Sequence, residues 1–366
     1  MTDVAARLVP APVRAQARRV SSQTWTAIVS AGCFVSLAAA LALVKVPFVS
    51  WSPGSTVDLL ATQGGKPVVQ VSGTKTWPVT GELRMTTVQV TRADSFLGLP
   101  EALAAYWLPN RDVLPRDMVY PRGKSAQEVR DEEVAMMDDS KADAVVAALR
   151  AAKIPVTEMP QVRSVVVSGP SYQKLEPGDL IQKVDQTDVQ TMDDVKRIVS
   201  AHKVGDAVVF TVLRDGVSRD VTVNTIASND SKTVPVVGIK QVIGYRYAPS
   251  VSYGIDPNIV GPSAGLVFSL AIYDQITEGD LVGGRKIAGT GGIGPDGAVS
   301  SIGGIQEKIA AAERAGAKIF LVPAGNCVDL GSAGSSMDLV KVSTLADTVA
   351  GLQALRDGND KEVPRC

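Results

Sequence analysis

The sequence predicts an α+β multidomain protein that begins with a single transmembrane helix. Three observations support this prediction. Residues 27–44 contain no charged side chain, residues 51–122 show the alternation and turn signals of β-strands, and residues 124–153 show helical periodicity. The chain has 366 residues, which is enough for two or three folded units at roughly 150 residues each.

The overall charge excludes one class of partner. Lys and Arg number 37 against 38 Asp and Glu, so the formal net charge is −1. A chain of this kind has no basic surface that could hold nucleic acid through its phosphates. We therefore expect no nucleic-acid partner. We also expect no metal and no other cofactor.

The first 50 residues predict a membrane anchor. The uncharged stretch from Ala27 to Val44 would span about 27 Å as a helix, close to the thickness of a bilayer core. Trp25 and Trp51 flank it, as interfacial anchors do. A cleaved signal peptide is the alternative, since LAAALA offers small residues for cleavage. The apolar run is longer than the core of a signal peptide, which favours the anchor.

The charges around this stretch predict its orientation. Lys45 is the only charged residue between the end of this stretch and Pro47. Four arginines precede it: Arg7, Arg14, Arg18 and Arg19. By the positive-inside rule, residues 1–24 form a cytoplasmic tail, residues 25–46 cross the cell membrane once, and roughly 315 residues follow outside the cytoplasm.

The three cysteines do not predict a disulfide framework. Cys33 falls inside the membrane segment, whereas Cys327 and Cys366 both fall on the oxidising side. Whether these two pair is left open by the sequence, because pairing depends on a distance that spacing does not reveal.

The segment after the membrane is predicted as a membrane-proximal region over residues 50–155, β-rich first and helical later. In DDSKADAVVAALRAAKI, Ser140 is predicted as the N-cap of the helix. Its apolar face follows at helical spacing: Ala144, Val145, Ala148 and Leu149.

Residues 156–228 show a pattern of strand, turn, strand, helix, strand, turn and strand. Thr191 and Asp194 form a T-x-x-D capping box at the start of the helix. With LEPGDLI from Leu175 and VGDAVVFTVLRDG from Val204, the block resembles a PDZ domain of the kind found with bacterial proteases. The resemblance implies capture of extended peptides or C-termini by strand addition. No glycine-apolar carboxylate loop is evident before Val165.

Two features of this block imitate catalytic residues. Ser171 and Lys174 match S-x-x-K, but no partner motif follows, and a turn just before Pro177 predicts a loop serine and a solvated lysine. His202 is the one histidine of the chain, and its surroundings predict a surface position at a helix C-terminus.

The stretch GPSAG, from Gly261 to Gly265, fits the pattern G-x-S-x-G of a nucleophile elbow. Leu266 and the apolar residues after it recur at helical spacing, so we expect Ser263 in the first turn of a buried helix. An α/β-hydrolase is excluded, because its histidine follows the serine and His202 precedes Ser263. Any base for this serine must be another residue type.

Lys308 is the candidate base. It lies at the margin of an apolar helix face that includes Ile305 and Ile309. A lysine at such a margin often extends to solvent, but burial would lower its pKa and leave a neutral amine able to accept the serine proton.

The residues GPSAG, IAGTGGI, IGGIQEK and AGAKIFLVP together resemble the proteolytic domain of Lon proteases, peptidase family S16. The resemblance covers residues 233–355 as a Lon-like proteolytic α+β domain and leaves 356–366 as a C-terminal tail. It implies that Ser263 is the nucleophile, Lys308 the general base and Thr290 the residue that orients the lysine. Anchor, PDZ and Lon-like domain in this order resemble the membrane-anchored YlbL-type proteases of Gram-positive bacteria.

Two departures from large Lon proteases qualify the resemblance. Those enzymes carry an acid three residues before the serine, where this chain has Val260, so a gating role for that acid is in doubt. No G-x-x-x-x-G-K-[ST] motif occurs in the sequence, which predicts cleavage without ATP.

The function predicted is an ATP-independent, membrane-anchored serine endopeptidase acting on extracytoplasmic or membrane proteins, with the PDZ domain assisting substrate capture. Its partners are protein or peptide substrates and, through the N-terminal helix, the lipid bilayer. By analogy with Lon rings we expect a homo-oligomer, of a size that the sequence does not determine. The alternative is a non-catalytic PDZ scaffold on a Lon-like fold.

Overall fold

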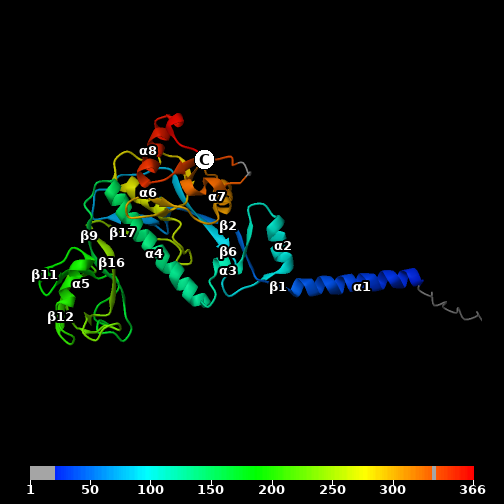
Figure 1. Ribbon diagram of the computed structural model, residues 1–366. Coiled ribbons are helices and arrows are strands. Elements are labelled where there is room, and N and C mark those ends of the chain that lie inside the picture. The colour runs from blue at the N-terminus through cyan, green and yellow to red at the C-terminus, as the bar shows by residue number, and fades with distance from the viewer. Residues whose placement is uncertain (1–20, 332–334) are drawn as a thin grey trace, which may run out of the picture.

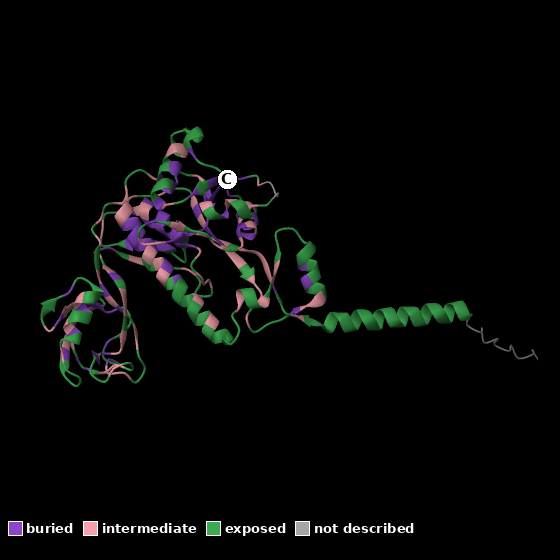
Figure 2. Cartoon of the chain, in the orientation of Figure 1, coloured by how far each residue is buried: buried purple, intermediate pink, exposed green. Residues whose placement is uncertain are grey.

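The computed structural model describes residues 21–331 and 335–366, and its first element is a long apolar helix (Figure 1). Helix α1 (Ser22–Leu43) starts at Ser21, whose side chain accepts a hydrogen bond from the Thr24 N–H. None of its residues is buried, and it projects away from the rest of the chain (Figure 2). Within the described residues it is the helix long and apolar enough to cross a membrane. The four arginines of the predicted cytoplasmic tail lie outside the described residues.

The main sheet has six strands in the order β22-β21-β18-β6-β2-β8. Parallel strands β18, β21 and β22 come from the C-terminal third, and β6 pairs with β18 in parallel and with β2 in antiparallel register. The bounds are β2 (Phe48–Asp58), β6 (Glu82–Val90), β8 (Asp112–Pro115), β18 (Lys286–Gly289), β21 (Ile319–Pro323) and β22 (Asp338–Val342). The predicted membrane-proximal region and the predicted Lon-like domain therefore share one sheet.

Three helices pack on this sheet: α6 (Gly265–Ile276), α7 (Ile305–Arg314) and α8 (Leu345–Arg356). A fourth helix, α4 (Ala126–Ala151), packs on α6 and α8. Helix α6 is apolar on nearly all sides, and ten of its twelve residues are buried. It packs against α4, and both contribute to one core with side chains from the sheet, such as Leu83, Leu149 and Phe268. Burial of α6 follows from its composition, since a helix without a polar face is stable only inside a core.

Helix α4 starts earlier than predicted. Ser125, not Ser140, is its N-cap, and Ser125 and Glu128 form a reciprocal capping box. The prediction of Ser140 was wrong because the first half of α4 is exposed and polar, so the apolar pattern begins only where the helix meets the core. Ser140 lies buried within the helix, and its hydroxyl donates to the carbonyl oxygen of Pro262 at 3.0 Å.

A second sheet, in the order β13-β12-β10-β9-β16, is inserted between α4 and β17 (Ser250–Tyr253) (Figure 1). Helix α5 (Met192–Ser200) packs against it, and Thr191 and Asp194 form the predicted capping box. The last strand of this sheet, β16, lies beyond residue 228, the predicted end of the PDZ domain. The bounds are β9 (Thr157–Val165), β10 (Leu180–Val184), β11 (Thr187–Asp188), β12 (Ala207–Arg214), β13 (Val217–Asn224) and β16 (Ile239–Arg246).

The remaining elements are short. Strand β5 (Val69–Ser72) pairs with β17, and helix α2 (Leu99–Trp107) follows β7 (Leu97–Gly98), which pairs with β1 (Lys45–Val46) next to the end of α1. The others are β3 (Thr62–Gln63), β4 (Lys66–Pro67), α3 (Arg116–Val119), β14 (Ile226–Ala227), β15 (Pro235–Val236), β19 (Gly292–Ile293), β20 (Val299–Ser300), η1 (Ala324–Asp329) and η2 (Asp360–Glu362).

The C-terminal segment folds back on the main sheet. Cys366 forms a disulfide with Cys327 of η1, with a Cα–Cα distance of 5.3 Å. The N–H of Cys366 also donates to the carbonyl oxygen of Leu339 in β22. The pairing that the sequence left open is present, and Cys33 on α1 is a free cysteine.

Candidate active site

Ser263 lies in a turn directly before α6. The helix begins at Gly265 with Ala264 as its N-cap, so Ser263 precedes the helix. The prediction that Ser263 lies in the first turn of the helix was therefore wrong. Helix α4 holds this turn from one side: the N–H of Gly261 donates to the carbonyl oxygen of Glu133 at 3.1 Å, and the Ser140 hydroxyl holds the next residue. Gly261 has a φ of 95°, a region that favours glycine.

Lys308 comes from α7 and points into the core. The helix begins after Gly304, whose φ of 69° is left-handed, and its neighbour Gly303 packs on the ring of Trp51. A Cβ added to Gly303 would lie 2.5 Å from that ring, so only glycine fits. The Lys308 side chain is buried, with the residue 2% exposed. It does not extend to solvent.

The three predicted site residues meet at one point. The Lys308 Nζ lies 2.7 Å from the Ser263 Oγ and 2.8 Å from the Thr290 Oγ1. Thr290 is fully buried and follows β18, and its hydroxyl donates to the carbonyl oxygen of Ser263 at 2.9 Å. Because that hydroxyl has a single proton, it accepts from the lysine. The amine is thereby oriented toward the serine.

Burial lowers the pKa of Lys308 from an ordinary 10.5 to about 7. The neighbouring Glu307 carboxylate acts in the opposite direction and is the smaller effect. The lowered pKa makes the neutral form of the amine accessible near neutral pH, and this is the form that can accept a proton.

Glu307, next to Lys308 in α7, is not among the site residues that the sequence predicts. It is buried, and among the described residues neither of its carboxylate oxygens has a hydrogen-bond partner. Burial raises the pKa of this carboxyl. Helix α7 packs against β2, β6 and β21 of the main sheet and against η1, so more of its surface is covered than residue spacing indicates.

A cleft of about 1140 Å³ opens at Ser263 and Lys308. One wall consists of β2 and β6, where residues 86–90 of β6 lie beyond the end of β18 and pair with β2 alone. The opposite wall is the exposed half of α4. Val260 lines the cleft where large Lon proteases have an acid, and Glu133 of α4 supplies a partly buried carboxyl in the same cleft.

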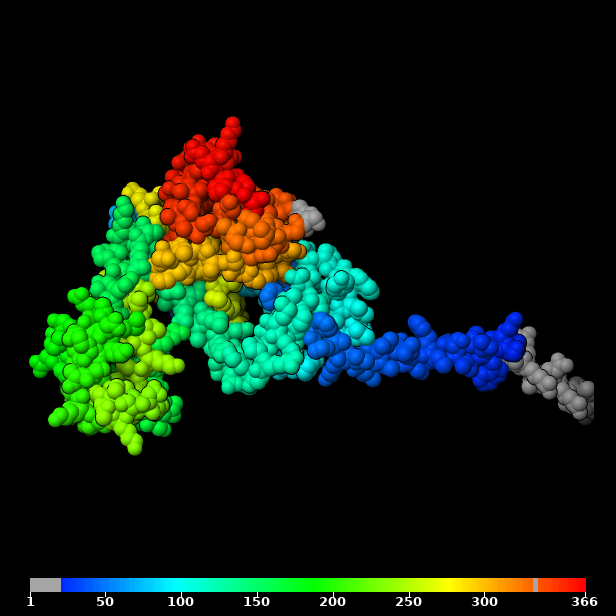
Figure 3. Space-filling model, in the orientation of Figure 1, coloured from blue at the N-terminus to red at the C-terminus, as the bar shows by residue number. Residues whose placement is uncertain are grey.

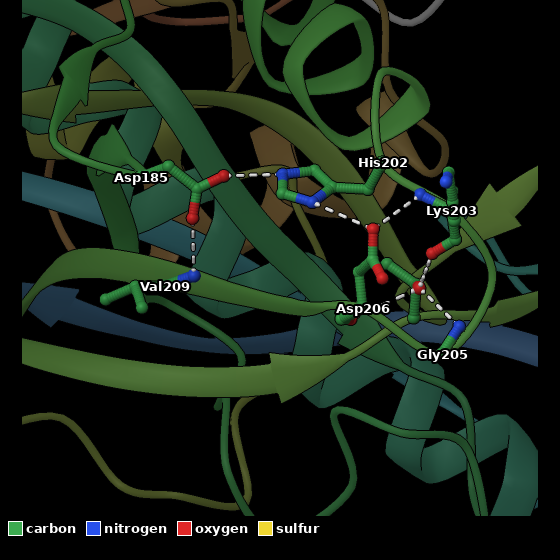
Figure 4. A network of polar contacts seen from close by, with 7 residues as sticks. Asp185, His202, Lys203, Gly205, Asp206 and Val209 are labelled. Atoms are coloured by element: carbon green, nitrogen blue, oxygen red, sulfur yellow. Dashed lines mark hydrogen bonds and ion pairs between the residues drawn. The ribbon is translucent and has the colours of Figure 1, made fainter.

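The two imitations of catalytic residues lie in the second sheet. The Nε2 of His202 is 2.6 Å from Asp185, whose other carboxylate oxygen accepts the N–H of Val209 at 2.9 Å (Figure 4). The Ser171 hydroxyl is buried and donates to the carbonyl oxygen of Val237, whereas Lys174 is exposed. His202 and Ser171 each have a hydrogen-bond partner within the PDZ unit, and neither contacts Ser263.

Comparisons with known proteins agree with this architecture. Residues 136–225 match the PDZ domain model, and residues 252–351 match the model of the Lon protease (S16) C-terminal proteolytic domain. The chain joins a PDZ domain to a Lon-type proteolytic domain. These matches confirm the predicted fold class, and the exact domain limits stay predictions.

Each of the similar proteins matches one part of this chain. The Lon protease of Rhizobium meliloti is 35% identical over 133 residues, which are 31% of this chain and 16% of that protein. The Lon protease of Roseiflexus castenholzii is 41% identical over 70 residues, 19% of this chain and 8% of that one. The PDZ domain of an SdrC-like protein from Listeria monocytogenes is 24% identical with a TM-score of 0.22, covering 23% of this chain and 87% of that one. The chain thus spans a small fraction of the curated relatives' length.

Replacing Thr290 by valine should lower the rate about 10- to 100-fold, because the amine loses the hydroxyl that orients it while its burial is kept. The midpoint of the pH–rate profile should change much less than the rate. Steady-state cleavage of one peptide across a pH series measures both quantities. A large shift of the midpoint at an unchanged maximal rate would contradict an orienting role.

Replacing Glu307 by glutamine should move the ascending limb of the pH–rate profile to lower pH. The carboxylate raises the pKa of Lys308, so its loss lets the amine become neutral at lower pH. Glu313→Gln, on the same helix but bonded to Ser335 and Ser336, is the matched control and should leave the limb in place. A shift toward higher pH in Glu307→Gln would contradict this account.

Proposed function

We propose that this protein is an ATP-independent, membrane-anchored serine endopeptidase in which Ser263 is the nucleophile and Lys308 the general base. The observation that carries the proposal is the 2.7 Å contact between a buried lysine amine and the Ser263 hydroxyl. A buried amine without a carboxylate partner at hydrogen-bonding distance is costly, and such sites commonly serve chemistry.

In the proposed reaction the neutral amine of Lys308 removes the proton of Ser263 as its oxygen attacks the substrate carbonyl. The resulting ammonium then protonates the leaving amine, which releases the first product. In the second half, the amine takes a proton from a water molecule as that water attacks the acyl-enzyme. The ammonium then returns the proton to the Ser263 oxygen as the bond to the acyl group breaks, which releases the acid product and regenerates the serine. Thr290 holds the amine in position throughout, through its contact at 2.8 Å.

The negative charge of the tetrahedral intermediate needs hydrogen-bond donors. In the described part of the chain, the main-chain N–H groups of Ser263 and Ala264 donate to no main-chain carbonyl oxygen. They lie at the N-terminal end of α6, where the helix dipole favours negative charge. We assign the stabilising role to these groups.

The substrate is an extended or unfolded chain. The cleft has a volume of about 1140 Å³, and along it residues 86–90 of β6, beyond their pairing with β18, offer a strand edge on the side of Ser263. An extended substrate can add to such an edge through main-chain hydrogen bonds, which tolerate many side chains.

The PDZ domain captures substrate C-termini in our proposal. Its sheet ends at β16, and the turn before that strand contains Val237 and Gly238, a glycine with φ of 71°. Val166 and Ser171 hydrogen-bond to the carbonyl oxygens of these two residues. No carboxylate loop is evident in the sequence before Val165, so we propose this turn, which follows the last strand of the sequence pattern, as the candidate. A peptide would add to the free edge of β16.

The catalytic domain is extracytoplasmic in this proposal, because four arginines precede the apolar helix. Protease added to intact cells stripped of their wall should digest the chain after about Ser52. A fully protected C-terminal domain would refute this topology.

The test of the function is cleavage of an unfolded protein by the full chain in detergent micelles, with and without ATP and Mg²⁺. We expect new amino termini at the same rate in both conditions. A requirement for ATP would contradict the proposal. Retained peptide binding without any cleavage would favour the alternative, a PDZ scaffold.

A further inference from the structure

Helix α2 exposes an apolar face that the fold leaves uncovered. The side facing the protein is made of small residues, Ala102 and Ala105, both buried. The exposed side chains of the helix include Leu103, Tyr106 and Trp107, of which the last two are 71% and 75% exposed. Phe96 and Leu108, which precede and follow the helix in the sequence, are also exposed, and so is Met118 on α3.

This surface, made of Phe96, Leu103, Tyr106, Trp107, Leu108 and Met118, is here called the α2 surface. Large exposed apolar side chains gathered on one short helix and its neighbours are uncommon in proteins that function in water alone, so the α2 surface indicates a binding partner. Tryptophan and tyrosine in particular are enriched where proteins meet the headgroup region of a bilayer.

The position of α2 identifies the partner. The N–H of Leu99, its first residue, donates to the carbonyl oxygen of Val44 at 2.9 Å, directly after the end of α1. Strand β1 pairs with β7 just before α2, with Lys45 opposite Gly98. The cyan lobe that contains α2 lies against the end of the blue α1 (Figure 3). A bilayer spanned by α1 would therefore meet α2 at its surface.

The lengths agree with this position. Helix α1 has 22 residues, which span about 33 Å and cover the hydrocarbon core without any help from α2. Its end, and the start of α2 bonded to it, then fall at the level of the headgroups. The exposed basic side chains of Lys45 and Arg111 lie before and after this segment, where they complement anionic lipid headgroups.

We propose that α2 is an interfacial helix whose α2 surface inserts into the outer headgroup layer of the membrane that α1 spans. The occupant of the surface is lipid. The proposal rests on the membrane anchoring of the proposed function and adds a second membrane contact to it. In this position α2 holds residues 92–94, which line the rim of the cleft, near the bilayer.

The test uses the full chain reconstituted in vesicles of phosphatidylglycerol and phosphatidylethanolamine. In a Cys33→Ser background, a single cysteine carries an environment-sensitive fluorophore at position 103 or at position 101. Leu103 lies on the α2 surface, whereas Glu101 lies on another side of the same helix and is the matched control. The wild-type Cys33, labelled in the same way, reports the bilayer core.

We expect nitroxide-labelled lipid to quench the fluorophore at position 103 several-fold more strongly than at position 101, and iodide in the water to show the reverse order. Equal iodide quenching at both positions would overturn the proposal. Protection of position 103 from iodide without quenching by lipid would also overturn it, because the occupant would then be protein, such as a second copy of the chain.

Vesicle flotation separates this inference from the anchoring on which it rests. A chain that does not float with vesicles lacks the anchor, and both ideas fail. The chain can also float while lipid quenches the label on Cys33 and iodide quenches the label at position 103. This result would support the anchor and overturn only the proposal of an interfacial helix.

Discussion

Replacing Ser263 by alanine should abolish peptide-bond cleavage, with a fall in kcat of about 10³- to 10⁶-fold. The loss is large because the Ser263 oxygen forms the bond to the substrate carbonyl, and no other described hydroxyl lies at hydrogen-bonding distance from Lys308 except that of Thr290. The rate of appearance of new amino termini on an unfolded substrate measures this effect.

The control for this substitution is Ser300→Ala, which removes an exposed serine on β20 outside the cleft. It should keep full activity. Both variants should unfold at nearly the wild-type temperature, because neither change removes packing from the core. Cleavage by a folded Ser263→Ala protein within tenfold of the wild-type rate would show that the nucleophile lies elsewhere.

Replacing Lys308 by methionine should abolish cleavage to a similar extent, since a nucleophile and its base act as one unit. The substitution should also stabilise the protein at neutral pH. A lysine whose pKa falls from 10.5 to about 7 on folding costs roughly 5 kcal/mol when the protein folds at low pH, where the amine must be charged. Methionine fills a similar volume without this cost.

The sign of the pH dependence follows from the lowered pKa. The unfolded chain binds the proton more tightly than the folded protein, so wild-type stability should rise as pH increases from about 7 toward 10.5. This rise should be absent in Lys308→Met and present in Lys318→Met, which removes an exposed lysine. Denaturant unfolding at several pH values measures it. A stability loss in Lys308→Met at pH 7 would contradict burial of a destabilised amine.

The three site residues could be predicted from the sequence because each lies in a local pattern. GPSAG places Ser263 on a turn before an apolar helix, and the segments around Thr290 and Lys308 resemble the Lon family closely. The geometry confirms that the three lie together, at 2.7 and 2.8 Å. Their catalytic roles remain a proposal.

The walls of the cleft could not be predicted. Strand β6 pairs in parallel with β18, with Glu82 opposite Lys286, and no local pattern reports a pairing between segments so distant in sequence. The same applies to α4, whose Ser140 hydrogen-bonds to the turn that precedes Ser263. A helix start was assigned to Ser140 because periodicity reveals only the part of a helix that packs on a core.

The PDZ strand order escaped prediction for a related reason. Strand β16 pairs with β9 along its whole length, although the PDZ domain model ends at residue 225. A sequence pattern follows chain order, whereas the edge of a sheet is decided by which strands meet in space. The turn at Gly238, which we propose as the carboxylate loop, lies beyond the residues that show the PDZ pattern.

We propose that a neutral, buried lysine is the base. The pH–rate profiles of the wild type and of His202→Gln on one peptide substrate test this proposal. We expect kcat/KM to rise with pH with a midpoint near 7. We expect the same rise in His202→Gln, since His202 is hydrogen-bonded to Asp185 in the PDZ domain. Histidines in general titrate in this range, which makes the variant necessary. Loss of the ascending limb in His202→Gln, or a midpoint near that of free lysine, would contradict the assignment of Lys308.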